Sequence, residues 1–260
     1  MLCQICKKKL IKIATFTKPF FNEKIFTKKS LFKKNIFKCL SCNHHKIDSF
    51  DYKKVNKIYT RMYGKLAYSN FKNKFLKISA VKKENSSNYF RKKYIISNFK
   101  LNKNNKLLDF GSGTGIFPYS INKICDCYFH DKDKNSINFC KNFLNLKFAN
   151  ISKLKSSKPQ FDYITCNKVL EHMSIQDIKK NLLIFKKLLK KSGKIYIELP
   201  DERASKKGYS RQEFFSEHIN IFSIKSSKLF FSKLGFTINK ISSLLEVTNK
   251  YTLRIILSKN

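Results

Sequence analysis

Short apolar runs alternate with amphipathic stretches along the chain from residue 106 onward. The apolar runs contain four to six residues, which is typical of buried strands, and fall at residues 107–110, 127–130, 161–166 and 194–199. Apolar residues three and four positions apart indicate helices in the stretches between them, at residues 119–124, 135–144 and 175–189. This alternation predicts an α/β fold, with a mostly parallel sheet covered by helices on both faces.

The end of the chain has a different pattern. Ser192-Gly193 is expected to end the helix at residues 175–189, and a further helix is expected over residues 226–234. Two β-rich runs then meet at Asn249-Lys250, which predicts an antiparallel hairpin.

The first hundred residues do not show the α/β alternation. Residues 1–50 combine paired cysteines with short β-like runs such as residues 11–16. The pattern then becomes helical, with apolar residues spaced three and four apart at Val55, Ile58, Tyr59 and Met62. A break at residues 85–88 offers a cap for a second helix. We therefore expect a small module over residues 1–50, a helical connector over residues 51–100 and the α/β domain over residues 101–260.

The eight cysteines fall into two sets. Four are scattered through predicted strands and helices and are expected to be buried thiols in a reducing compartment. The other four form two CxxC pairs, Cys3 with Cys6 and Cys39 with Cys42. Four thiolates satisfy tetrahedral zinc, so the pairs predict a zinc-ribbon-like module with a structural Zn²⁺. A redox dithiol is the alternative, and His44 or His45 is a substitute ligand for one cysteine.

A glycine-rich loop follows the first strand of the α/β domain. It reads Asp109-Phe110-Gly111-Ser112-Gly113-Thr114-Gly115, with an acid before three glycines at alternate positions. Such glycines let the backbone turn sharply and let a ligand approach without a Cβ atom in the way. A dinucleotide site would read GxGxxG instead, and a tight turn without a ligand is the alternative. After the next strand come two acids, Asp131 and Asp133.

This loop resembles motif I of the class I S-adenosylmethionine-dependent methyltransferases, which reads D/E-x-G-x-G-x-G. The resemblance implies a Rossmann-like, doubly wound, mostly parallel seven-stranded sheet and S-adenosyl-L-methionine as the cofactor. Asp131 also matches the spacing of the family, in which an isoleucine follows six residues later, here Ile137. The resemblance assigns cofactor binding to Asp109, Gly111, Gly113, Gly115 and Asp131. It implies that Asp131 accepts hydrogen bonds from ribose hydroxyls, with Asp133 as the second candidate.

A second part of the chain, Phe161-Asp162-Tyr163-Ile164 followed by residues 167–172, is similar to the FDxI…VLEH pattern of one branch of these enzymes. The similarity places Asn167, Glu171 and His172 beside the cofactor, at the carboxyl ends of the strands, where open α/β sheets bind ligands. The alternative for Glu171-His172 is the polar start of a helix. Asn150 stands where the family often has an acid that touches adenine.

A third part of the sequence indicates a particular branch of this family. Residues 197–200, Ile-Glu-Leu-Pro, and residues 213–223 resemble the EVP…EHxxxFS segment of zinc-containing sugar C-methyltransferases. The resemblance implies that Glu217 and His218 are catalytic. His218 is expected to act as a general base, because imidazole titrates close to neutrality, while Glu217 orients it or shares the proton. The alternative is that His218 caps the helix that begins near Ile224.

Two departures from that branch leave the acceptor open. Phe215 replaces a tyrosine of the family and removes a hydroxyl group. The chain also stops after the predicted hairpin, whereas sugar C-methyltransferases carry a further C-terminal domain. A nucleotide-linked sugar or cell-envelope precursor is the expected small-molecule acceptor, with the methyl group moving to carbon, nitrogen or oxygen. The oligomeric state is not indicated.

The charge of +38 raises the question of a nucleic-acid partner, because clustered Lys and Arg bind phosphates. Lysines occur in every segment and tryptophan is absent, which favours a biased amino-acid composition instead. An RNA methyltransferase is nevertheless the alternative enzyme, although Cys166-Asn167-Lys168-Val169 replaces an NPPY-like tetrad and Cys166 lacks the proline neighbour of a cytosine-5 nucleophile. A non-catalytic binding protein with this fold would leave Glu217-His218 unexplained.

The chain carries no apolar stretch of about 18–20 residues and no apolar signal core after Met1. We therefore expect no membrane span and a cytoplasmic location.

Overall fold

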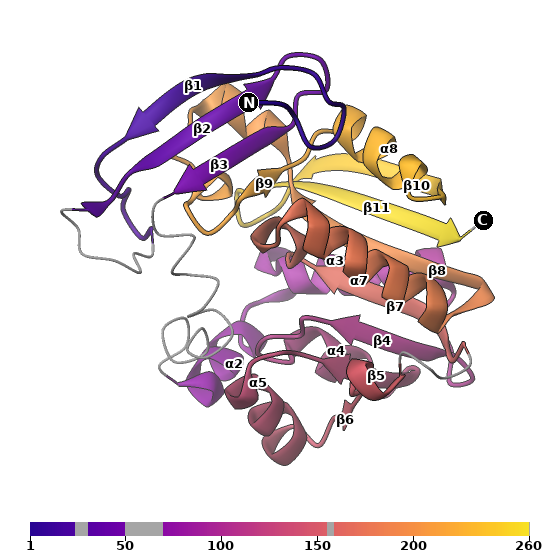
Figure 1. The fold of residues 1–260 in the computed structure, drawn as a ribbon. Helices are drawn as coiled ribbons and strands as arrows, with labels where there is room; N and C mark the ends of the chain where they lie inside the picture. The colour runs from indigo at the N-terminus through magenta and orange to yellow at the C-terminus, as the bar shows by residue number, and fades with distance from the viewer. Residues whose placement is uncertain (24–30, 50–69, 155–158, 260) are drawn as a thin grey trace.

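The computed structural model describes residues 1–23, 31–49, 70–154 and 159–259 (Figure 1). These residues form a four-stranded sheet that contains the N-terminal strands and a seven-stranded sheet that forms the α/β domain. The apolar residues that predict the first connector helix, Val55, Ile58, Tyr59 and Met62, lie outside the described residues. Among the helices in the described ranges, none is long and apolar enough to cross a membrane.

The four-stranded sheet joins the two ends of the sequence. Three of its strands, β1 (Leu10–Phe16), β2 (Lys34–Cys39) and β3 (His45–Ser49), form an antiparallel meander. The fourth strand, β9 (Asn220–Ile221), pairs antiparallel with β3 although it lies about 175 residues further along the chain. In Figure 1 β9 lies beside the three N-terminal strands at the top of the view. The N-terminal module therefore packs directly on the segment that follows His218.

The seven-stranded sheet has the order β10-β11-β8-β7-β4-β5-β6. Its parallel strands are β4 (Lys106–Phe110), β5 (Asp126–His130), β6 (Lys147–Phe148), β7 (Phe161–Asn167) and β8 (Leu189–Pro200). At the edge, β11 (Tyr251–Lys259) runs antiparallel to β8 and pairs with β10 (Phe236–Leu245). The predicted Rossmann-like, mostly parallel sheet and its C-terminal hairpin are confirmed.

Helices cover both faces of this sheet. The α-helices are α2 (Phe71–Ser79), α3 (Ser87–Phe99), α4 (Ile116–Ile121), α5 (Lys134–Asn138), α6 (Ile151–Leu154), α7 (Ile175–Leu188) and α8 (Ile224–Lys233). Shorter turns are η2 (Lys83–Asn85), η4 (Leu170–His172), η5 (Glu202–Lys207), η6 (Gln212–Phe214) and a π-helical turn, η3 (Phe139–Phe143). The predicted break before α3 is confirmed, because the Ser86 side chain accepts a hydrogen bond from the Tyr89 amide and caps the helix.

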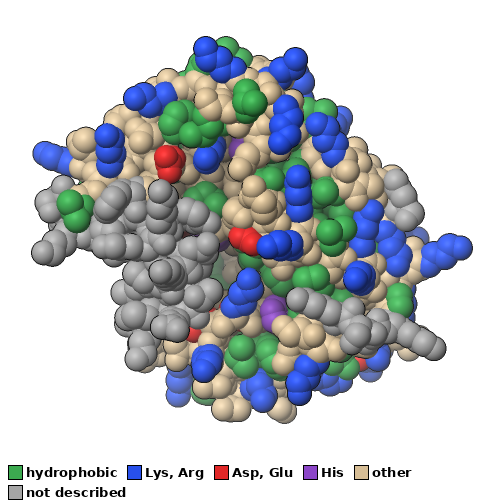
Figure 2. Space-filling view, viewed as in Figure 1, with side chains coloured by type: hydrophobic (Ala, Val, Ile, Leu, Met, Phe, Trp, Pro, Cys, Tyr) green, Lys and Arg blue, Asp and Glu red, His purple; other side chains and the backbone are tan. Residues whose placement is uncertain are grey.

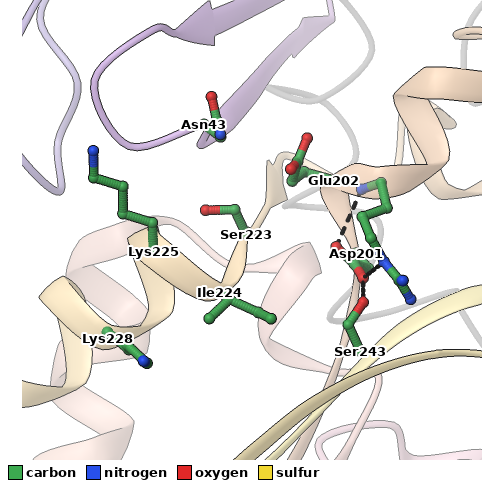
Figure 3. A pocket seen from close by; sticks show the side chains of 9 residues that line it. Asn43, Asp201, Glu202, Ser223, Ile224, Lys225, Lys228 and Ser243 are labelled. Carbon is green, nitrogen blue, oxygen red and sulfur yellow. Dashed lines mark hydrogen bonds and ion pairs between the residues drawn. The ribbon is translucent and has the colours of Figure 1, made fainter.

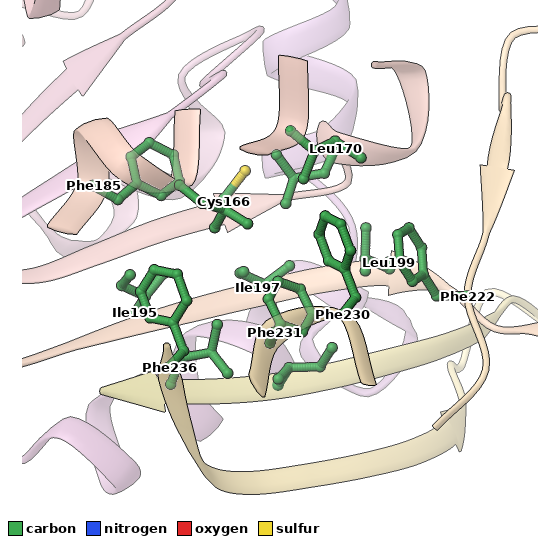
Figure 4. Packing of buried hydrophobic residues seen from close by; sticks show 14 of the residues in the cluster. Cys166, Leu170, Phe185, Ile195, Ile197, Leu199, Phe222, Phe230, Phe231 and Phe236 are labelled. Carbon is green, nitrogen blue, oxygen red and sulfur yellow. The ribbon is translucent and has the colours of Figure 1, made fainter. Parts of the chain in front are cut away.

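Two apolar layers hold the helices to the sheet. On one face, Phe185 of α7 and Phe231 of α8 pack with strand residues such as Ile195 (Figure 4). The same cluster extends into the N-terminal module through buried residues that include Cys3 and Leu10. On the other face α3 and α4 pack against the sheet through Ile95, Phe99, Phe117 and Ile121. Because the module and α8 share one core, the module is anchored to the α/β domain by apolar burial.

The end of α7 differs from the prediction. The helix stops at Leu188, and Ser192-Gly193 lies inside β8 instead of ending the helix. A Cβ atom on Gly193 would lie 2.6 Å from Leu189 Cγ and 2.9 Å from the Asp162 carbonyl oxygen. The register between β7 and β8 also shifts between Phe161 and Tyr163. Close packing around β8 therefore requires a glycine at position 193. In the sequence, a glycine required for this reason looks the same as one that ends a helix.

Candidate active site

The glycine loop connects β4 to α4 at the carboxyl edge of the sheet. All three glycines have positive φ angles, between 53° and 75°. A Cβ atom on Gly111 would meet Val169 Cγ2 at 2.5 Å, and one on Gly115 would meet Cys140 Sγ at 2.7 Å. A Cβ atom on Gly113 would meet no heavy atom within 4 Å. Two glycines therefore permit tight packing, and Gly113 borders open space at the position where a ligand would approach.

Asp109, the acid before the glycines, is buried and bonds to residues of the neighbouring strand β7. Asp109 is 2% exposed, and its carboxylate accepts hydrogen bonds from Thr165 Oγ1 at 2.7 Å and from Asn167 Nδ2 at 2.9 Å. Burial raises the pKa of Asp109 to about 6, against the effect of these donors. The Asn167 amide oxygen has no hydrogen-bond partner in the described residues. Asp109 thus orients the Asn167 amide, whose oxygen is buried without a hydrogen-bond partner among the described residues.

Asp131 and Asp133 have different surroundings. The Asp131 carboxylate accepts hydrogen bonds from the Gly113 amide at 2.8 Å and from the Asp133 amide at 2.9 Å. Asp133 caps α5, accepting a hydrogen bond from the Asn135 amide at 3.1 Å. Burial raises the pKa of Asp131. Asp131 therefore lies against the glycine loop and Asp133 caps α5, while the ribose-binding role of Asp131 stays a prediction.

The two Glu-His pairs lie together beside this edge. The rings of His172 and His218 are 4.9 Å apart, and His172 Nδ1 lies 2.9 Å from the Glu217 carbonyl oxygen. The Ile219 amide donates to the Glu171 carbonyl oxygen at 2.9 Å. Side-chain atoms of Glu171, His172 and His218 lie within 4.8 Å of one another. Residues from two motifs 46 positions apart in the sequence thus form one titratable cluster.

Burial sets the charges in this cluster. Desolvation, followed by the nearby His172, lowers the pKa of His218 to about 4. Desolvation raises the pKa of Glu171 to about 7, and both carboxylate oxygens of Glu171 lack a hydrogen-bond partner in the described residues. His218 Nδ1 lies 3.0 Å from the Glu213 carbonyl oxygen and so carries the proton of the neutral ring. The Nε2 lone pair of His218 is consequently available at neutral pH.

His218 does not cap the helix that follows it, contrary to the alternative reading of the sequence. Ser223 is the N-cap of α8, and its side chain forms a reciprocal capping box with Ser226. The sequence expectation that Glu217 and His218 belong to the active site remains compatible with their position.

The four module cysteines form a second cluster. Sγ atoms lie 3.7 Å apart in Cys3–Cys42 and 3.3 Å apart in Cys6–Cys39, and all four lie within 4.8 Å of one another. Tetrahedral zinc with Zn–S bonds of about 2.3 Å separates sulfurs by roughly 3.8 Å, so the cluster fits this metal with little movement. His44 Nδ1 lies 3.9 Å from Cys3 Sγ, outside the set of four thiols. The remaining cysteines, Cys125, Cys127, Cys140 and Cys166, are buried as expected.

A cavity of about 410 Å³ lies elsewhere, between the module and α8 (Figure 3). Its lining includes both signs of charge, with Asp201 and Arg203 paired at 2.9 Å and Lys225 near the start of α8. None of the residues predicted to bind cofactor or to act in catalysis lines this cavity.

Comparison with known proteins defines the class. The methyltransferase domain family matches residues 85–241, which is more than half of the chain. The chain therefore belongs to the methyltransferase domain family and is a class I S-adenosylmethionine-dependent methyltransferase. The match begins at residue 85, so it includes α3 from the range expected to be a connector. No curated protein matches the chain significantly.

Solved structures share the fold at low sequence identity. Magnesium protoporphyrin IX methyltransferase from Synechocystis PCC 6803 with bound SAH is 10% identical, with a TM-score of 0.57 over 78% of this chain and 100% of that chain. The form with bound SAM is 12% identical, with a TM-score of 0.55 over 79% and 97%. The PH0226 protein from Pyrococcus horikoshii OT3 is 18% identical, with a TM-score of 0.53 over 68% and 94%.

Proposed function

We propose that this enzyme methylates a small molecule, and that the acceptor is a nucleotide-linked sugar or a cell-envelope precursor. The observation that carries the proposal is the gathering of Glu171-His172 and Glu217-His218 into one cluster, buried at Glu171 and partly exposed at the other three residues, at the carboxyl edge of the sheet. The resemblance of the Glu217-His218 segment to zinc-containing sugar C-methyltransferases supports the acceptor class.

Three groups at the ends of adjacent strands would hold the cofactor. Gly113 follows β4, Asp131 follows β5 and Asn167 ends β7, and these strands are neighbours in the sheet. Gly113 offers open space, Asp131 a carboxylate for ribose hydroxyls and Asn167 an amide oxygen. When bound, S-adenosyl-L-methionine supplies an electrophilic methyl group. The protein's contribution is to place the acceptor in line with that group.

His218 would take the proton that the acceptor loses as its new bond to methyl forms. The Nε2 lone pair is available because Nδ1 bonds to a backbone carbonyl. A Glu217 carboxylate oxygen lies 3.8 Å from Nε2 and would stabilise the imidazolium that results. Glu171, with a pKa of about 7 and carboxylate oxygens that have no partner among the described residues, is suited to receive the proton next. This arrangement gives both Glu-His pairs a use.

The N-terminal cysteines would bind one structural Zn²⁺. The four thiols surround one point, and two equivalent turns present them, with positive φ angles at Lys7 and Asn43 just after each pair. A closed set of four protein ligands leaves no position for substrate, so the metal would have a structural role.

The distribution of charge supports a small acceptor over RNA. On the face shown in Figure 2, Lys and Arg side chains are scattered among other residue types instead of forming one continuous patch. Nucleic-acid binding surfaces concentrate positive charge where the backbone lies. On this face, the scattered charges favour a biased amino-acid composition over a nucleic-acid site.

A transfer assay with methyl-labelled S-adenosylmethionine tests the proposal. Purified protein is incubated with a panel of nucleotide-linked sugars and, separately, with total RNA. We expect label in a sugar product and its loss in the His218→Gln variant. Label in RNA alone would overturn the acceptor class in favour of an RNA methyltransferase, and transfer to sugar that is unchanged in His218→Gln would overturn the role of His218.

A further inference from the structure

The segment that carries the proposed catalytic pair, residues 214–223, is held on two sides. The α/β domain contacts it through η4, by the bond from Ile219 to Glu171, the bond from His172 to Glu217 and a bond from Asn220 Nδ2 to the Met173 carbonyl oxygen at 2.7 Å. The N-terminal module contacts the other side. The module touches this segment both before and after Glu217 and His218.

The contact before the pair is a buried charge. Lys34 of β2 is fully buried, and its ammonium lies 2.7 Å from Glu23 and 3.1 Å from the Phe214 carbonyl oxygen. The Glu23 carboxylate also accepts a hydrogen bond from the Ser216 amide at 2.6 Å. The Phe215 ring lies 6.0 Å from the same ammonium. A buried ion pair adds little net stability, but its fixed geometry can specify one arrangement of the backbone, here of residues 214–216.

The contacts after the pair connect to the cysteine cluster. Strand β9 pairs with β3, and the Ser223 hydroxyl donates to the Cys42 carbonyl oxygen at 2.7 Å. His44 bridges the two, with Nδ1 at 3.9 Å from Cys3 Sγ and Nε2 at 3.1 Å from Asn220 Oδ1. Because Asn220 Nδ2 donates to the Met173 carbonyl, its oxygen must accept from His44 Nε2. With Nε2 as the donor, Nδ1 of the neutral ring can only accept, so its 3.9 Å contact with Cys3 is a hydrogen bond while Cys3 is a thiol and a packing contact once Cys3 is a metal-bound thiolate. A continuous chain of contacts therefore runs from the cysteine cluster through His44 to the α/β domain, two residues after His218.

The two side chains that form the middle of this chain of contacts, His44 and Asn220, are both buried. His44 is 2% exposed and Asn220 is 3% exposed, so neither side chain is there for solubility. Buried polar groups are costly unless each bond is made, and removing one partner leaves the other unsatisfied. The position of Asn220 thus depends on His44, and the position of His44 depends on the cysteine cluster that it touches.

We propose that the N-terminal module positions the catalytic pair, and that His44 and Asn220 are the positioning residues through which the metal-bound cysteine cluster fixes residues 217–220. The proposal rests on the function proposed for His218. It gives the module a role in the reaction without contact with the reacting atoms. Lys34 and Glu23 form the second anchor, at residues 214–216.

The test uses the full-length protein with and without zinc, and needs no acceptor. NMR titration of the histidine ring signals reports the pKa of His218, which is identified by the loss of its signal in His218→Gln. With zinc bound, we expect the pKa of His218 to lie near 4, because the ring is buried. After removal of zinc by a chelator it should rise towards the ordinary value of about 6.5, and zinc should restore it. Hydrogen exchange at Ile219 and Ser216 should quicken by about tenfold or more.

A set of variants isolates the polar chain. His44→Ala should keep zinc yet reproduce the shift at His218, and His44→Gln, which retains an amide donor, should restore part of the effect. Lys46→Ala is the matched control, since Lys46 lies in β3, two residues after His44, and within the described residues its ammonium donates a hydrogen bond to Met1 Sδ instead of to the His44–Asn220 pair. It should change neither readout.

One result would overturn the proposal: zinc removal that quickens exchange only within residues 1–49 and leaves His218 and Ile219 unchanged. Equal behaviour of His44→Ala and Lys46→Ala would likewise remove His44 from the role. The function proposed above fails separately, because absence of methyl transfer to sugars by the zinc-bound protein would not alter these measurements.

Discussion

The two halves of the proposed active site, the cofactor half and the catalytic half, are built in opposite ways. The cofactor half consists of loops at the ends of neighbouring parallel strands, and its main bond, from Gly113 to Asp131, spans 18 residues. The catalytic half is assembled from distant parts of the chain, with 176 residues between His44 and Asn220 and 193 between Glu23 and Ser216. One half belongs to the shared fold, and the other depends on a module added to it.

This difference has a consequence for mutations. A change in the N-terminal module should disturb catalysis while cofactor binding persists, because the hydrogen bonds of the module's described residues reach residues 214–223 and, among those residues, none reaches the glycine loop. A change at Asp131 should do the reverse. Sites more than about 7–10 Å apart without shared partners usually contribute independently.

The largest effect is expected at His218. His218→Ala should lower turnover by about 10²–10⁴, the usual contribution of general acid–base catalysis, with cofactor affinity unchanged. Stability should change little through helix capping, because Ser223 caps α8. Turnover on a sugar acceptor, calorimetric affinity and melting temperature measured on one preparation check this. Full turnover in the variant would exclude His218 as the base.

Glu171 should produce a dependence of stability on pH. Its pKa rises from 4.5 in the unfolded chain to about 7 when folded, so the native state holds the extra proton between these values and loses stability as pH rises through them. The loss should reach about 3 kcal/mol above pH 7. Glu171→Gln should remove this slope, so the variant gains relative to the wild type as pH rises from 4.5 to 7. Denaturant unfolding across that range measures it, and parallel curves for both proteins would contradict the shift.

Asp131 and Asp133 form a matched pair. Asp131→Ala should weaken S-adenosylmethionine binding by roughly 10- to 150-fold, corresponding to about 1.5–3 kcal/mol for a charged hydrogen-bonding group. Asp133→Ala should leave the affinity in place and cost about 1 kcal/mol of stability, because Asp133 caps α5. Calorimetry and unfolding of both variants separate the roles. The opposite pattern would assign the ribose contact to Asp133.

Much of the cofactor half could be predicted from the sequence. The apolar runs that become β4, β5 and β7 are local signals, and the glycines at alternate positions require a special backbone. The hairpin could be predicted equally well, because two β-rich runs flank a turn at which Asn249 adopts a positive φ angle. Each of these features depends on residues close together in the chain.

The catalytic half could be predicted only through its motif. Glu217 and His218 stand out by resemblance, but nothing near Lys34 or Glu23 distinguishes them from the other charged residues of a lysine-rich chain. Strand β9 contains two residues, and it forms a strand because it pairs with β3. The prediction that Gly193 ends a helix was wrong for a related reason. One of the two residues whose contacts require a glycine there, Asp162, lies 31 positions earlier in the chain, and the other is Leu189. Long-range contacts leave no periodic signal.

The most direct test of the division between the two halves is the affinity for S-adenosylmethionine in a protein without its zinc. Cys39→Ser should lose about one zinc per chain, because one of the four thiols of the cluster is removed. Calorimetry should then give a cofactor affinity within about twofold of that of the wild type, the margin expected for independent sites. Wild-type protein purified without metal, or an affinity that falls as far as in Asp131→Ala, would contradict the account.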